Sequence, residues 1–124
     1  KTLEIIQREQ IEVMPIVPAM LSRFWQIENA KEKMKSLRCL ISGGDRLPKS
    51  LIDTTHKEIG EVLFNLYGTS EAGFFMLATP KELASFEETT LGKPIQGVDC
   101  KIKNLNEEGI GTLWVRSRWA MRGL

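Results

Sequence analysis

The sequence predicts an α/β fold, in which a parallel sheet with βαβ crossovers is followed by the start of an antiparallel β lobe. Helix-like and strand-like segments alternate up to residue 68, short connections separate them, and a two-residue periodicity takes over after about Leu91. Such alternation favours parallel strands joined by right-handed crossovers. We therefore expect two parts, with residues 1–88 in an α/β lobe and residues 89–124 in an antiparallel β hairpin region.

The α/β part is expected to contain helices and strands in strict alternation. Residues 1–9 place Leu3 and Ile6 on one helical face, and residues 19–26 space their apolar side chains in the same way. A third helix begins near Pro48, which a first helical turn tolerates, and ends at Gly60. Strands are expected at residues 13–17, 37–41 and 61–67, although Pro15 cannot donate to a strand ladder.

The last part of the chain has the pattern of a hairpin. Residues 98–105 and 112–116 alternate apolar and polar side chains, and a turn that contains Asn106 and Gly109 separates them. The chain does not begin with Met, and its first residues resemble a helix already under way. We therefore expect it to be an internal portion of a longer parent chain.

Composition excludes several classes of protein. The 17 Lys and Arg residues against 16 Asp and Glu residues leave a net charge of +1, which indicates no nucleic-acid partner and no anionic membrane surface. The longest apolar stretch is shorter than the ~20 residues of a membrane span and contains prolines. Cys39 and Cys100 lack a metal-binding spacing, and His56 is the only histidine, so no self-contained histidine-rich metal site is expected.

The most informative segments follow the second and third expected strands. Ser42-Gly-Gly-Asp-Arg follows one strand, and Tyr67-Gly-Thr-Ser-Glu follows the other. Parallel sheets bind ligands outside the carboxyl ends of their strands, paired glycines allow a close backbone approach, and an aromatic ring can stack on a base. Glu71 adds a hard oxygen ligand of the type that Mg²⁺ prefers. The residues alone fit a nucleotide and metal site, and they fit a simple tight turn or a helix cap equally well.

The segment from Asn65 to Gly73, N-L-Y-G-T-S-E-A-G, resembles the Y-G-x-[ST]-E motif of the adenylate-forming (AMP-binding) enzyme superfamily. A Val-Pro segment, the S-G-G loop, L-G-K-P-I-Q-G and G-T-L-W-V-R-S accompany it in the order that this superfamily shows. The resemblance covers essentially the whole chain and is of the acyl-CoA synthetase type. It implies an internal fragment of the large N-terminal domain, in which residues 1–88 belong to the nucleotide-binding lobe.

The resemblance implies nucleotide-binding roles for residues of both loops. Gly44, Asp45 and Arg46 match the stretch whose backbone runs along the adenine. Asn65 matches a residue that bonds the adenine amino group in part of the superfamily, and Tyr67 matches the ring that stacks on adenine. Asp45 and Arg46 replace the more usual residues, so we expect their backbone rather than their side chains to matter.

Further roles are implied around the phosphates and the acyl group. Ser70 matches a hydroxyl residue that contacts the α-phosphate, and Glu71 matches the Mg²⁺-coordinating carboxylate. Gly68 and Thr69 would lie beside the acyl adenylate and complete the eight residues expected to bind the nucleotide. Looser candidates for the acyl pocket are Val17, Phe74 and Phe75.

The function implied by the resemblance is that of an ATP-dependent ligase. Such an enzyme joins a small carboxylic acid, with fatty acids among the candidates, to AMP and then to coenzyme A, and Mg²⁺ assists. The phosphate loop, the ribose-binding Asp and the catalytic Lys are expected in the rest of the parent chain. No catalytic residue is therefore assigned here, and the isolated chain is expected to be inactive. A cytoplasmic enzyme of fatty acid metabolism is expected.

Two alternatives remain open from the sequence. One is a non-enzymatic α/β interaction or ligand-binding module, and the other is a peptide-synthetase adenylation domain. The ligase prediction makes a geometric demand that the module does not. The strands at residues 37–41 and 62–66 must be parallel neighbours, so that their loops form two walls of one cleft. Tyr67 should then face the cleft, and Glu71 should be at least partly exposed.

Overall fold

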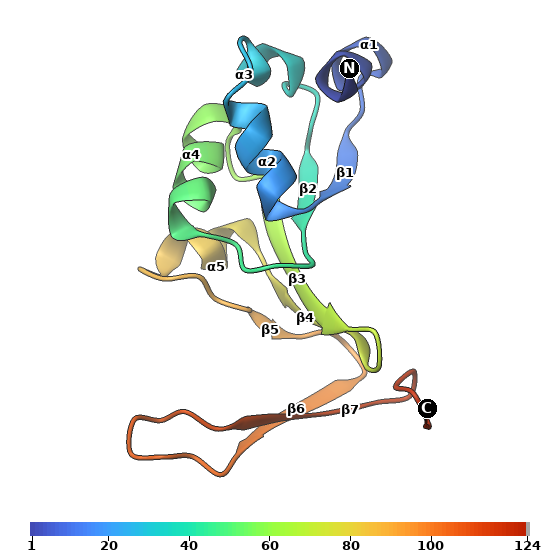
Figure 1. Cartoon of the computed structure of the whole chain (residues 1–124), viewed down its shortest axis with the longest axis vertical. Helices are drawn as coiled ribbons and strands as arrows, with labels where there is room; N and C mark the ends of the chain where they lie inside the picture. The colour runs from blue at the N-terminus through green and yellow to red at the C-terminus, as the bar shows by residue number, and fades with distance from the viewer. Residues whose placement is uncertain (124) are drawn as a thin grey trace.

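The computed structural model describes residues 1–123, in which helices and strands alternate along the first half of the chain (Figure 1). Leu124, the last residue of the predicted hairpin region, lies outside the described residues. No helix of residues 1–123 has the length and apolarity needed to cross a membrane. In chain order the elements are α1 (Thr2–Glu9), β1 (Val13–Ile16), α2 (Pro18–Trp25), α3 (Ala30–Lys33), β2 (Cys39–Ser42), α4 (Lys49–Ile59), β3 (Leu63–Thr69), β4 (Gly73–Ala78), α5 (Pro80–Ser85), β5 (Lys93–Pro94), β6 (Val98–Lys103) and β7 (Thr112–Ser117).

The main sheet has the strand order β1-β2-β3-β4-β5. The first three strands are parallel, and β2 lies directly beside β3, with Leu40 paired to Leu63 and Ser42 paired to Asn65. The predicted parallel sheet with crossovers is therefore confirmed. β1 lies at the edge of the sheet, where Pro15 removes only one donor, as expected for a proline in a strand.

Three elements, β4, α5 and β5, were not predicted from the sequence. β4 and β5 extend the sheet in antiparallel fashion, so the predicted alternation stops at β3. α5 begins with a capping box: Thr79 Oγ1 accepts from the Glu82 N–H at 3.3 Å, and the Glu82 carboxylate accepts from the Thr79 N–H at 2.8 Å. This box, together with Pro80 in the first turn, is the sequence signal that would have revealed α5.

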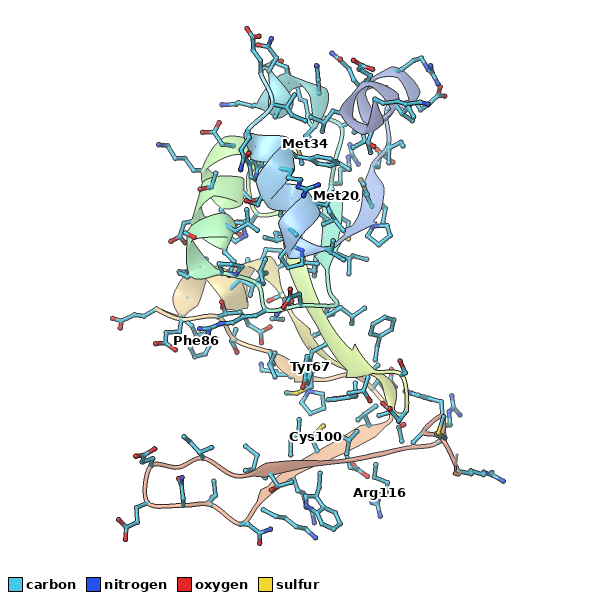
Figure 2. The ribbon with its side chains drawn as sticks, in the orientation of Figure 1. Met20, Met34, Tyr67, Phe86, Cys100 and Arg116 are labelled. Carbon is cyan, nitrogen blue, oxygen red and sulfur yellow. The ribbon has the colours of Figure 1, made fainter. Side chains whose placement is uncertain are left out.

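The core lies between the sheet and the helices. Leu21 of α2, Leu40 of β2 and Ile52 of α4 are fully buried within one apolar cluster. The Trp25 indole N–H donates to the Thr55 hydroxyl at 3.1 Å and so ties α2 to α4. Figure 2 places Met34 among these helices. The helices thereby fix the strands whose ends carry the predicted site.

β6 and β7 form a separate antiparallel sheet of two strands, which confirms the predicted hairpin. The hairpin projects from the end of the molecule opposite α1 and α3 (Figure 1). Its apolar side chains Ile102 and Trp114 are largely exposed. The β6–β7 hairpin therefore adds no core of its own within the described residues.

Candidate nucleotide and acyl site

The carboxyl ends of β2 and β3 lie side by side, because the two strands are parallel neighbours. This geometry confirms the demand that the ligase prediction made of the two loops. One detail of the prediction was wrong: β3 does not end before Gly68 but continues through Thr69. Gly68 and Thr69 pair with Phe74 and Gly73 of β4, so Tyr67, Gly68 and Thr69 belong to a strand rather than to a loop.

The end of β3 carries a β-bulge. Tyr67 pairs with Met76 and Gly68 pairs with Phe74, so the register skips Phe75. A Cβ atom on Gly68 would lie 2.2 Å from the Gly73 carbonyl oxygen and 2.7 Å from the Phe74 Cα. Only glycine fits there, and the bulge re-aims the side chains that follow it.

A cavity of about 780 Å³ opens between the ends of β2 and β3. This volume is typical of small-molecule sites, which span roughly 300–1,000 Å³. All eight residues predicted to bind the nucleotide line the cavity. The complete lining is Gly44, Asp45, Arg46, Leu47, Asn65, Leu66, Tyr67, Gly68, Thr69, Ser70, Gly73, Phe74, Thr89 and Leu91.

Tyr67 lines this cavity as expected, and 38% of its surface is exposed. Figure 2 places it between the helical part of the molecule and the hairpin that carries Cys100 and Arg116. Its ring meets the buried ring of Phe75 edge to face. The buried Phe75 ring thereby holds the Tyr67 ring at the cavity.

Asn65 is the buried polar residue of the cavity, at 4% exposure. Its Nδ2 donates to the Thr90 carbonyl at 3.4 Å. No group of residues 1–123 donates to its Oδ1. A side-chain amide accepts through this oxygen, so Asn65 can accept a hydrogen bond from an amino group in the cavity.

The segment after α5 forms a third wall, which the sequence analysis did not assign to the site. Thr89 and Leu91 line the cavity, and the Thr89 hydroxyl donates to the Leu47 carbonyl. The Asn65 bond to Thr90 attaches the same segment to β3. Its overlap with the L-G-K-P segment, which begins at Leu91, was the available signal.

The polar residues at the mouth of the cavity differ in how they are held. Asp45 Oδ1 accepts from the Arg46 N–H at 2.7 Å, and both side chains are exposed. Thr69 Oγ1 accepts from the Ala72 N–H at 3.1 Å, which fixes the turn between β3 and β4. Ser70 is exposed and lines the cavity. Its hydroxyl can therefore reach a ligand there.

Glu71 lies on the β3–β4 turn, is exposed and does not line the cavity itself. Because residues 70–72 connect two antiparallel strands, the helix-cap alternative is wrong. The Glu71 carboxylate forms no ion pair within residues 1–123, and no group of three metal-ligating side chains occurs in that range. A single carboxylate of this kind suits Mg²⁺, which binds through one or two carboxylates, water and phosphate oxygens.

Shifted pKa values occur away from this cavity. Burial lowers the pKa of His56 on α4, although Glu61 opposes the shift. The hydrogen bond from the Thr79 backbone lowers the pKa of Glu82, and burial raises the pKa of the Cys100 thiol. None of the three lines the cavity. This part of the site therefore offers shape, hydrogen bonds and charge rather than a tuned acid or base.

A second, apolar cavity of about 410 Å³ adjoins the first. Gly44, Leu66 and Phe74 line both cavities. Of the acyl-pocket candidates, Val17 and Phe74 line the second cavity, whereas Phe75 is buried and lines neither. The other residues that line the second cavity are Pro15, Ile16, Met20, Ile41 and Gly43, so no charged side chain lines it.

Comparison with known protein families shows to which family the chain belongs. Residues 1–124 match the family described as AMP-binding enzyme. The chain belongs to the AMP-binding enzyme family. The predicted resemblance is confirmed, and membership of an enzyme family fits the ligase prediction rather than the non-enzymatic module.

Curated relatives in this family are CoA ligases. The chain is 33% identical over 122 residues to a 2-succinylbenzoate–CoA ligase of Staphylococcus aureus (strain MSSA476). The match covers 98% of this chain and 24% of that relative. The chain is 28% identical over 122 residues to the enzyme of the same name from Lactococcus lactis subsp. lactis (strain IL1403), with 97% and 26% covered. The chain thus spans about a quarter of the length of these relatives.

Solved structures of the family share the fold. The amide bond synthetase McbA from Marinactinospora thermotolerans superimposes with a TM-score of 0.82 at 29% identity, over 98% of this chain and 26% of that one. The anthranilate CoA ligase AuaEII in complex with anthranoyl-AMP gives a TM-score of 0.77 at 20% identity, over 96% and 24%. The second likeness bears on the fold alone. Both agree with the mixed sheet and the separate hairpin.

Proposed function

We propose that these residues form the adenylate-binding part of an ATP-dependent acid–CoA ligase. The observation that supports this most strongly is the cavity between β2 and β3, whose lining includes all eight residues predicted for the nucleotide. Membership of the AMP-binding enzyme family and the CoA ligases among its relatives point the same way. In this proposal residues 1–88 belong to the nucleotide-binding lobe and residues 89–124 to the β lobe.

The adenine would lie against Tyr67, with its amino group donating to Asn65 Oδ1. The backbone of Gly44, Asp45 and Arg46 would run along its other side. These contacts suit a purine because a flat ring needs a stacking surface and its exocyclic amine needs an acceptor. Binding at this position would direct the phosphates toward Ser70.

The reaction proposed is attack of a carboxylate oxygen on the α-phosphorus of ATP, with release of pyrophosphate. The Ser70 hydroxyl would donate to the α-phosphate and stabilise the charge that develops there. Glu71 would hold Mg²⁺, which supplies neutralisation of phosphate charge when bound. Gly68 and Thr69 would flank the acyl adenylate. The sulfur of CoA would then attack its acyl carbon, so that the thiol loses its proton, the acyl–phosphate bond breaks and AMP leaves.

The apolar cavity would receive the body of the acid. Val17, Met20 and Phe74 offer only apolar contacts, and burying an unpaired charge among them would be costly. We therefore propose an acid with an uncharged body, either aromatic or a fatty acid. Because ATP and CoA are the proposed co-substrates, we expect the enzyme to work in the cytoplasm.

ATP–pyrophosphate exchange by the protein that contains this chain tests the proposal. We expect exchange with benzoate or octanoate and little with succinate, whose second carboxylate has no partner in the apolar cavity. Thioester formation with CoA would then separate a CoA ligase from a peptide-synthetase adenylation domain, which transfers to a carrier protein. The isolated 124 residues should show no exchange. Absence of exchange with every acid would refute the proposal.

A further inference from the structure

The segment after β7 returns to the turn that carries Glu71. The Met121 N–H donates to the Glu71 carbonyl oxygen at 2.6 Å, although the two residues are distant in sequence. Figure 1 shows the segment that follows β7 beside the turn that joins β3 and β4. The backbone of the turn is therefore held by the segment that leaves the β6–β7 hairpin.

The side chain of Trp119 strengthens this attachment. A Cβ atom on Gly73 would lie 3.0 Å from Trp119 Cδ1, and one on Gly97 would lie 3.6 Å from Trp119 Cη2. The five-membered side of the indole thus lies over Gly73 and the six-membered side over Gly97. Both glycines have positive φ angles, of 70° and 85°, so glycine is favoured at each position, and a larger side chain would displace the ring.

The paired residues Thr69 and Gly73 flank the turn, and few contacts hold the residues between them. The hydrogen bond from the Ala72 N–H to the Thr69 hydroxyl closes it from within. Ser70 and Glu71 are exposed, and the Glu71 carboxylate makes no ion pair within residues 1–123. The direction of this carboxylate therefore depends on where the turn backbone is held.

We propose that Trp119 is a positioning residue for the Glu71 carboxylate. The indole braces the turn through Gly73, and the Met121 N–H anchors the turn through the Glu71 carbonyl. The inference rests on the proposed function, because it assumes that Glu71 binds Mg²⁺ together with ATP. Residues behind a metal ligand fix its orientation, and removing one typically lowers metal affinity or activity about 10–100-fold.

If Trp119 positions Glu71, its removal should affect one part of ATP binding and not the other. Removing it should weaken the part of ATP binding that depends on Mg²⁺ and leave the adenine contacts unchanged, since Asn65 and Tyr67 lie on β3 and are supported from β4. A role in general stability would instead weaken ATP binding with and without the metal.

The test measures ATP affinity by calorimetry in the full-length protein, once with excess Mg²⁺ and once with a chelator. The affinity with Mg²⁺ is divided by the affinity without it. This ratio is compared for the parent protein, Trp119→Ala, Trp119→Leu and Trp119→Phe. We expect the ratio to fall about tenfold in the Ala and Leu variants. Phe keeps a flat ring and should restore most of it. The affinity without Mg²⁺ should stay the same in all four proteins.

Trp114→Ala is the matched control, because Trp114 is an exposed tryptophan of β7 that contacts Lys103 rather than the turn. Its ratio should equal that of the parent. If Trp119→Ala does not fold, the Leu variant decides. An unchanged ratio in the Ala and Leu variants would overturn the inference while leaving the proposed function intact. A parent protein that binds no ATP, or gains nothing from Mg²⁺, would defeat both.

Discussion

The ring of Tyr67 meets the ring of Phe75 edge to face, with centroids 5.2 Å apart and planes at 82°. Phe75 is the residue that the strand register skips, and it is buried at 3% exposure. The bulge therefore turns Phe75 inward, where it supports the ring that lines the cavity. An edge-to-face pair of this kind adds about 0.5–1.5 kcal/mol beyond the area it buries. The stacking surface is thereby set before any ligand binds.

Replacing Tyr67 with Ala should weaken ATP binding about tenfold or more. Loss of an aromatic surface under a base costs about 1–3 kcal/mol in alanine substitutions, and 1.4 kcal/mol corresponds to a factor of ten. Tyr67→Phe should bind nearly as tightly, because it keeps the ring. Calorimetry with ATP measures all three proteins.

Phe86→Ala controls for the loss of an exposed ring, since Phe86 is exposed and lies outside the cavity. Its ATP affinity should match that of the parent. Equal affinities for the Tyr67→Ala and Phe86→Ala variants would exclude adenine stacking on Tyr67.

Gly68→Ala should destabilise the protein and abolish nucleotide binding together. The new methyl group would lie 2.2 Å from a backbone carbonyl oxygen that cannot move without opening the bulge. Overpacking typically costs about 1–3 kcal/mol. Urea unfolding measures the free energy. Gly123→Ala, with no atom within 4 Å of the added Cβ, should have no effect. A Gly68→Ala protein of parental stability would show that the bulge is not tight.

Glu71→Gln should raise the Mg²⁺ concentration needed for half-maximal ATP–pyrophosphate exchange. A neutral amide is a poor ligand for Mg²⁺, and the exposed site should tolerate the nearly isosteric change. Glu108→Gln, in the exposed turn between β6 and β7, serves as the matched control. Equal Mg²⁺ requirements in the two variants would remove Glu71 from the metal site.

His56→Gln should make stability less sensitive to acid. The folded-state pKa of His56 lies below 6.5 because burial disfavours the charged ring. The unfolded chain therefore binds the proton more readily, and the parent loses stability as the pH falls below about 6.5, until the folded-state pKa is passed. Urea unfolding between about pH 7.5 and pH 5 should show a smaller loss in the variant. Within this range Glu82, with a pKa below 4.5, contributes little. Equal slopes would contradict the prediction.

The parallel strands and the hairpin could be predicted because their sequences are locally consistent. β2 is a short apolar run followed by glycines, and the hairpin strands alternate on both sides of the Asn106 turn, so local sequence defines these elements. The cavity followed from one geometric rule, since the ends of parallel neighbours lie at the same edge of a sheet. Asn65 and Tyr67 were predicted from the motif, and the structure brings them together.

The parts that were missed depend on contacts between distant segments. β4 pairs with β3, and β5 pairs with β4. Neither strand shows an alternation of apolar and polar residues that would identify it from sequence. Thr89 and Leu91 reach the cavity because a hydrogen bond to Leu47 draws their segment across the sheet end. The return of Trp119 to Gly73 is likewise a tertiary contact. The periodicity of the local sequence does not show such approaches.

The two strands of the β6–β7 hairpin have consequences for how the 124 residues would melt. A two-stranded sheet without a covering layer is marginally stable in water, and regions with few buried contacts open at low free energy. On warming, the amide protons of this hairpin should exchange with solvent before those of β2 and β3 do. The segment that carries Trp119 would be released with the hairpin. Heat would therefore loosen the turn at Glu71 at a temperature where the helices are still intact.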